Sequence, residues 1–293
     1  MTCAMSEFDI KDNTLQLHVH NFSLERSCTC GQAFRWVKRD NGSFCCVIGK
    51  ELVSVSQHRD TLCISPCSDT DATKYVTYFD LDRDYNAIED KMLADAVLKK
   101  CIPYASGIRV FAQEPFETLI SFIISANNNI KRISTTIERL CKACGEKMTA
   151  KDGTEYYLFP TAEALKNMPL TSLRELGLGY RDEYIKSTAE CIAEGFPLES
   201  LRDMPYTQAK KELCKLRGVG GKVADCVLLF SLGHGRAFPM DVWMKRAVSS
   251  MFFEGKEPKN AELCELLDGF GDDAGRIQQY IFHFARETGL KNE

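Results

Sequence analysis

One lysine and one aspartate stand where a reactive amine and a carboxylate could act on one substrate. Lys222 opens a helical pattern directly after the turn Gly218-Val219-Gly220-Gly221, and Asp241 follows nineteen residues later, after Pro239. A lysine amine is a nucleophile only in its neutral form, which burial and the positive end of a helix both favour. A nearby carboxylate can stabilise positive charge that develops during a reaction. The pair predicts a lysine nucleophile with a supporting carboxylate, although Asp241 is also well placed to be a helix N-cap.

Two helices must position this turn. The first is predicted over 207–216 with Thr207 as its N-cap, and the second over 222–232. Gly218 and Gly220 allow a tight turn and the close approach of another molecule. The free N–H groups at the start of the second helix favour an anion such as a DNA phosphate. The segment 207–232 therefore predicts a helix-hairpin-helix motif.

A nucleotide-binding P-loop is excluded as an alternative. That motif needs a glycine where Leu216 stands and a Ser or Thr where Val223 stands.

The chain resembles the helix-hairpin-helix DNA glycosylases, and within them the 8-oxoguanine DNA glycosylase branch. The resemblance covers nearly the whole chain. It is carried by Gly218-Val219-Gly220-x-Lys222-Val223-Ala224-Asp225-Cys226 with Pro239-x-Asp241-Val242, by Gly31-Gln32-Ala33-Phe34-Arg35-Trp36, by Asn127-Asn128-Asn129-Ile130-x-Arg132-Ile133 and by Leu176-Gly177-Leu178-Gly179-Tyr180-Arg181.

The resemblance implies that Lys222 attacks C1′ of a damaged nucleotide, expels the base, forms a Schiff base and nicks the strand by β-elimination. It implies that Asp241 is essential to base release. The damaged base must leave the helical stack to reach these groups.

The resemblance also implies how the extruded base is bound. The backbone carbonyl of Gly31 accepts from the N7–H that 8-oxoguanine has and guanine lacks, while Gln278 reads the Watson–Crick edge. Phe282 and Cys226 hold the two faces of the base. Gln278 and Phe282 are four residues apart and share a helix face.

Further residues are implied to contact the DNA. Tyr180 is the wedge in the stack, Asn127 fills the vacancy, and Arg132 and Arg181 contact the unpaired cytosine. Gly218, Gly220 and Val223 contact the phosphates. The chain departs from the family pattern at three positions, with Trp243 in place of a histidine, Ala285 in place of its acidic partner, and Arg217 in place of a proline.

Composition bounds the class of protein. No apolar run is long enough to span a membrane and residues 1–9 show no signal-peptide pattern, so the 14 cysteines are expected to be reduced thiols. Cys141-x-x-Cys144 lacks a second pair for zinc, and Cys264 alone cannot form an iron–sulfur cluster after Asp241. We expect no metal and no cofactor.

Positive charge is concentrated in one segment of the chain. The net charge is −4, yet residues 201–250 contain nine Lys/Arg and four Asp/Glu, which predicts a confined DNA-binding face. The resemblance implies that the partner is double-stranded DNA with 8-oxoguanine opposite cytosine, and we expect it to be bound by a monomer without membrane association. We expect a cytoplasmic, nucleoid-associated protein in a prokaryote and a nuclear one in a eukaryote.

The predicted fold class is α+β, with an antiparallel β domain over 1–105 and a mainly helical domain over 106–293. Strands are predicted over 15–20, 34–37, 44–48, 52–55, 61–64 and 75–79, with turns at Asn41-Gly42 and Gly49-Lys50. Helices are predicted near 88–97, from Pro115, and over 131–144, 182–194, 207–216, 222–232, 241–252, 260–267 and 274–288.

The resemblance, together with Lys222 and Asp241, implies a bifunctional 8-oxoguanine glycosylase and lyase. Two alternatives stay open at this point: a glycosylase for another damaged base, and a DNA-binding module without catalytic activity.

Overall fold

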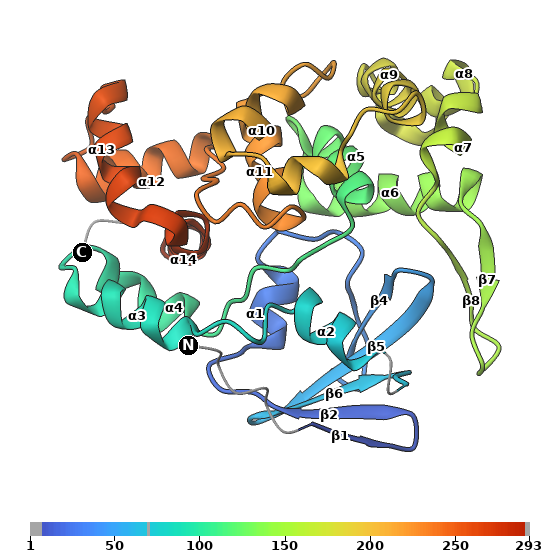
Figure 1. The fold of residues 1–293 in the computed structure, drawn as a ribbon, viewed down its shortest axis with the longest axis horizontal. Coiled ribbons are helices and arrows are strands. Elements are labelled where there is room, and N and C mark those ends of the chain that lie inside the picture. The colour runs from blue at the N-terminus through green and yellow to red at the C-terminus, as the bar shows by residue number, and fades with distance from the viewer. Residues whose placement is uncertain (1–7, 69–70, 291–293) are drawn as a thin grey trace.

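The structure, a computed structural model, describes residues 8–68 and 71–290. A six-stranded antiparallel sheet lies at the bottom of the view in Figure 1, and a larger body of helices lies above it. The order across the sheet is β1-β2-β6-β5-β4-β3. The strands are β1 Phe8–Lys11, β2 Thr14–His18, β3 Val37–Lys38, β4 Phe44–Ile48, β5 Glu51–His58 and β6 Thr61–Ser65. The α+β class is confirmed.

Tight turns set the register of the strands. Gly42 and Gly49 both have positive φ, which glycine adopts without steric cost, and they lie in the predicted turns on either side of β4. Across the second turn Ile48 pairs with Glu51. Alternate residues of β2, among them Leu15 and Leu17, point into the core.

The helical body carries the site, and most of its long helices match the predictions to within a few residues. The helices are α1 Leu24–Thr29, α2 Ala72–Tyr78, α3 Tyr85–Ala94, α4 Ile102–Ala105, α5 Pro115–Ser125, α6 Ile130–Cys144, α7 Ala162–Asn167, α8 Leu170–Leu173, α9 Arg181–Ala193, α10 Tyr206–Leu213, α11 Gly221–Phe230, α12 Val242–Phe252, α13 Asn260–Phe270 and α14 Ala274–Thr288. A small hairpin, β7 Lys147–Thr149 and β8 Glu155–Tyr157, was not predicted.

Three predictions of local structure are wrong. Residues 75–79, predicted as a strand, belong to α2 and its C-cap, because Tyr75 and Phe79 bury on one helix face against the sheet. Of the strand predicted over 34–37, only Val37 pairs, as the first residue of β3. The helix α10 begins at Tyr206 with Pro205 as its N-cap, so Thr207 lies inside it.

Three apolar cores stabilise the chain. One lies between the sheet and α2, and a second among α5, α6, α9, α10 and α11. The third joins α3 and α4 to α12 and α14, so that residues from 85–108 pack with residues from 238–285. The domain boundary at residue 105 stays a prediction. Among the described residues, no helix combines the length and the apolar character needed to cross a bilayer.

The sheet core contains an aromatic cluster around Trp36. Its ring packs against Tyr78, Phe79 and Phe111, and its Nε1–H donates to the Tyr78 hydroxyl at 3.3 Å. The cluster fixes the segment that runs from α1 to β3.

Candidate active site

The hairpin between α10 and α11 depends on Gly218. Its φ is +85°, and a Cβ there would lie 2.6 Å from the ring of Tyr184 on α9. Only glycine therefore allows this turn to pack against α9. Gly220 is the N-cap of α11, and the first N–H groups of a helix have no intrahelical acceptor. The side chain of Val223 is apolar and buried, so only its backbone N–H can bind an anion there.

Lys222 lies in the first turn of α11 with its ammonium against an aromatic wall. Its Nζ is 5.0 Å from the ring centroid of Phe122, which stacks on Phe230. Cys226, one turn further on, is buried, and burial raises the pKa of its thiol to about 11 although the Lys222 ammonium opposes that shift. At neutral pH this wall consists of a protonated thiol and aromatic rings.

Asp241 is the N-cap of α12, as predicted. Its carboxylate accepts a hydrogen bond from the backbone N–H of Met244 at 2.8 Å. This bond fixes the carboxylate at the start of the helix, and Asp241 and Lys222 line the same small cavity.

That cavity, which we call the lysine pocket, brings together all six residues predicted to act on or hold the base. Its volume is about 50 Å³. It is lined by Cys30, Gly31, Phe122, Lys222, Cys226, Phe230, Pro239, Asp241, Gln278, Gln279 and Phe282. These residues come from the segment after α1, from α5, from α11, from the segment before α12, and from α14.

Buried hydrogen bonds hold Gly31 in place. The next residue, Gln32, is fully buried; its Nε2 donates to the carbonyls of Ser27 and Arg109, and its Oε1 accepts from the N–H of Phe111. Gly31 itself has a φ of +91°. Its backbone is therefore positioned by the segment that leads into α5.

Two glutamines of α14 form the polar wall of the lysine pocket. Gln278 donates from Nε2 to the carbonyl of Pro239 at 3.3 Å and accepts at Oε1 from Nε2 of Gln279 at 2.7 Å. Five residues that line the pocket were not predicted from the sequence to belong to it: Cys30, Phe122, Phe230, Pro239 and Gln279. Among these residues, only Pro239 had a signal in the sequence, which is its position two residues before Asp241.

The residues predicted to contact the gap in the DNA lie in a second, exposed cluster. Tyr180 is 53% exposed, and Asn127, which has a φ of +51°, donates to its hydroxyl at 3.5 Å. Arg181 is buried: its Nε donates to the carbonyl of Ala126 at 3.0 Å, and its guanidinium lies 4.5 Å from the Tyr180 ring. In this structure Arg181 holds the turn that carries Asn127.

Arg132 lies on the first turn of α6 and is exposed. Its backbone N–H donates to Asn129, the N-cap of that helix. Trp243 is also exposed, at 46%, with the guanidinium of Arg246 5.9 Å from its ring. Ala285, by contrast, is fully buried in the core of α14.

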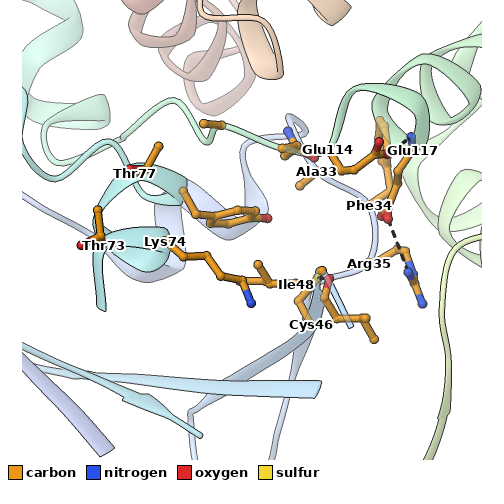
Figure 2. Close-up of a pocket in the computed structure, with 15 residues that line it drawn as sticks. Ala33, Phe34, Arg35, Cys46, Ile48, Thr73, Lys74, Thr77, Glu114 and Glu117 are labelled. Atoms are coloured by element: carbon orange, nitrogen blue, oxygen red, sulfur yellow. Dashed lines mark hydrogen bonds and ion pairs between the residues drawn. The ribbon is translucent and has the colours of Figure 1, made fainter. Parts of the chain in front are cut away.

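A larger cavity, about 380 Å³, lies between the sheet, α2 and the start of α5 (Figure 2). We call it the Arg35 cavity. Arg35 is an ion-pair partner of both Glu117, at 3.6 Å, and Glu138, at 3.2 Å. Burial raises the pKa of Glu117 to about 7, although Arg35 opposes the shift.

Metal-ligand side chains converge at one place in the described part of the chain. His18, His20 and Asp60 place a potential ligand atom each within 4.8 Å of one another, and all three are exposed. They belong to β2 and the loops beside it, and none of them lines the lysine pocket.

Comparison with known proteins agrees with this geometry. Residues 14–119 match the family model of the 8-oxoguanine DNA glycosylase N-terminal domain, and residues 120–270 match that of the HhH-GPD superfamily base excision DNA repair proteins. Over 264 residues the chain is 34% identical to the N-glycosylase/DNA lyase of Saccharomyces cerevisiae, covering 80% of this chain and 70% of the relative. A probable N-glycosylase/DNA lyase of Methanothermobacter thermautotrophicus is 32% identical, with 72% of each covered.

A solved structure extends the likeness to the whole fold. It is the 8-oxoguanine glycosylase/lyase of Clostridium acetobutylicum in complex with double-stranded DNA containing cytosine opposite 8-oxoguanine. The TM-score is 0.91 at 34% identity, and the match covers 99% of this chain and 100% of that one. The chain belongs to the 8-oxoguanine DNA glycosylase family within the HhH-GPD superfamily of base excision DNA repair proteins.

Proposed function

We propose that this protein excises 8-oxoguanine opposite cytosine from double-stranded DNA and then nicks the strand. The observation that carries the proposal is the meeting of Lys222 and Asp241 with Gly31, Gln278 and Phe282 in one pocket. A nucleophile, a carboxylate and a set of base-binding groups are the components that an excision with covalent catalysis requires.

In this mechanism the amine of Lys222 forms a bond to C1′ as the bond from C1′ to the base breaks. Asp241 stabilises the positive charge that develops on the sugar. The adduct becomes an imine when the sugar ring opens: the C1′–O4′ bond breaks and O4′ takes up a proton. The imine acidifies the hydrogen on C2′, and loss of that proton breaks the C3′–O bond and expels the 3′ phosphate, which is the β-elimination. The pocket places both groups on the same cavity, so one extruded nucleotide can contact them together.

Recognition follows from the groups on the opposite wall. The Gly31 carbonyl accepts from N7–H of 8-oxoguanine, whereas guanine would present a second acceptor there and leave both groups unpaired. Gln278 binds the Watson–Crick edge, and Phe282 and Cys226 contact the two faces. A cavity of about 50 Å³ holds a few water molecules and not a purine, so a lining side chain must move when the base enters.

Residues outside the lysine pocket contact the DNA around the lesion. The backbone of Gly218, Gly220 and Val223 binds phosphate at the start of α11. Tyr180 and Asn127 occupy the gap, and the guanidinium planes of Arg132 and Arg181 suit the acceptors of the unpaired cytosine. Because Arg181 is held by backbone carbonyls, its contact with cytosine requires those bonds to exchange. We propose that the protein acts as a monomer apart from membranes, at the chromosome.

The test is a borohydride trap with an 8-oxoguanine:cytosine duplex. The natural protein should form a covalent adduct that denaturing electrophoresis resolves, and Lys222→Gln should form none, because only the lysine can give an imine for borohydride to reduce. Lys11→Gln, which changes an exposed lysine on β1 outside the pocket, is the matched control and should trap like the natural protein.

Other outcomes separate the alternatives. Free base without an adduct would indicate a glycosylase without lyase chemistry. Trapping on another lesion and not on 8-oxoguanine would indicate a different substrate base. Binding with neither product would leave a DNA-binding module.

A further inference from the structure

A chain of hydrogen bonds across the lysine pocket ends on an atom that has no partner. It begins at the carbonyl of Pro239, which accepts from Nε2 of Gln278 at 3.3 Å. Oε1 of Gln278 then accepts from Nε2 of Gln279 at 2.7 Å. The last atom is Oε1 of Gln279, to which no donor within residues 8–68 and 71–290 forms a hydrogen bond.

The backbone carbonyl fixes the orientation of both amides. A carbonyl oxygen can only accept, so the end of Gln278 that faces Pro239 is the amino group. The other end of Gln278 is then an oxygen, which requires the amino group of Gln279 opposite it. The unpaired atom of Gln279 is therefore an acceptor.

An unpaired acceptor is costly at this depth. Gln279 is 4% exposed, and a buried carbonyl without a donor loses its hydration without replacement. An apolar side chain would fill the same space on α14 without that loss. Gln279 lines the lysine pocket directly beside Gln278, so a donor carried by the occupant of the pocket can reach this wall.

We propose that Gln279 is a second base-recognition residue, an inference that rests on the proposed excision of 8-oxoguanine. Its Oε1 accepts a hydrogen bond from the donor edge of the extruded base, at N1–H or the N2 amine. Its Nε2 holds Gln278 so that the second N–H of Gln278 is free for O6 of the same base. The two glutamines together present one donor and one acceptor to the Watson–Crick edge of a guanine-type base.

The experiment compares the natural protein with Gln279→Leu, which keeps the volume and removes the amide. Excess enzyme is mixed with an 8-oxoguanine:cytosine duplex, and base release is followed in a single turnover. Loss of the acceptor leaves the base donors unpaired, so release should slow by at least about tenfold. Gln16→Leu on β2, an exposed glutamine outside the pocket, is the matched control and should release base at the natural rate.

A second measurement separates recognition from folding. A duplex that carries tetrahydrofuran, an abasic sugar analogue, opposite cytosine lacks the damaged base. Gln279→Leu should therefore bind this duplex as tightly as the natural protein does. Its thermal midpoint should change little, because the substitution removes the unpaired Oε1 of Gln279 and in exchange leaves Oε1 of Gln278 without its donor. A merely structural glutamine would weaken abasic binding and lower the midpoint together.

Each result is decisive. Natural-rate base release by Gln279→Leu overturns the inference and leaves the proposed function intact. A slower release accompanied by an equal loss of abasic binding also overturns it. If the natural protein releases no 8-oxoguanine, the proposed function itself fails, and the inference with it.

Discussion

The lysine pocket and the Arg35 cavity are lined by neighbouring residues of one stretch of chain, and they differ in volume and in the chemistry of their lining. Gly31 lines the first, and Ala33, Phe34 and Arg35 line the second. The small pocket holds a lysine, a carboxylate and an unpaired amide oxygen, whereas in the large one the buried cation Arg35 is an ion-pair partner of the lining carboxylate Glu117 (Figure 2). Volume does not identify the site, because the lysine pocket is much the smaller of the two cavities. What distinguishes the lysine pocket is that an amine, a carboxylate and an unpaired amide oxygen line one cavity.

The largest effect expected from the comparison is on catalysis at Asp241. Asp241→Asn should lower the rate of base release by about 10²–10³ because the charge opposite the developing cation is lost. Asparagine is as good an N-cap as aspartate, so the thermal midpoint should stay the same. The check is single-turnover release alongside thermal unfolding; near-natural release would show that the carboxylate is only a cap.

A change in the Arg35 cavity should lower the stability of the fold and leave the rate of base release unchanged. Arg35→Met removes a buried guanidinium that also donates to the Tyr157 carbonyl at 2.6 Å and leaves the Glu117 carboxyl without its cation. Breaking such a buried pair costs about 3–5 kcal/mol in the free energy of unfolding. Denaturant unfolding measures that loss, and the release rate per trapped active site should not change. An unaltered unfolding midpoint would mean that the ion pair is not stabilising.

The smallest effect is a pH dependence of stability at Glu117. Its pKa is raised from 4.5 to about 7 in the folded state, so the unfolded chain ionises first as the pH rises. The stabilisation is complete below pH 4.5 and is lost as the pH rises through 7. Since the side chain keeps 23% of its exposure, the loss should be about 1–2 kcal/mol.

Glu117→Gln provides the comparison for that titration. Denaturant unfolding across pH 4.5 to 8 should give a flatter profile for this variant than for the natural protein. Parallel profiles would assign the dependence to another group.

The sequence predicted those parts of the molecule that local pattern determines. Helices with regular apolar spacing, such as α11 and α14, were found within a few residues because that spacing is a local property. Residues 75–79 were misassigned because Tyr, Val, Thr and Phe favour strands, and only packing against a sheet distant in sequence selects the helix.

The same division applies to the site. Lys222 and Asp241 were found from a turn and its spacing, and the lysine pocket contains both. Gln279 was not, because its importance depends on a carbonyl forty residues earlier that orients its neighbour. Arg181 was assigned to the opposite base, and its bonds to the Asn127 turn could be learned only from the fold.

The two tryptophans give the protein a built-in pair of optical reporters. Trp36 emits from within the aromatic cluster of the sheet, and Trp243 from the exposed first turn of α12 beside Arg246. Trp36 is partly buried and Trp243 is 46% exposed, so the two indoles differ in their access to an aqueous quencher. A single emission spectrum of the unlabelled protein can distinguish melting of the sheet core from occupation of the surface beside Asp241.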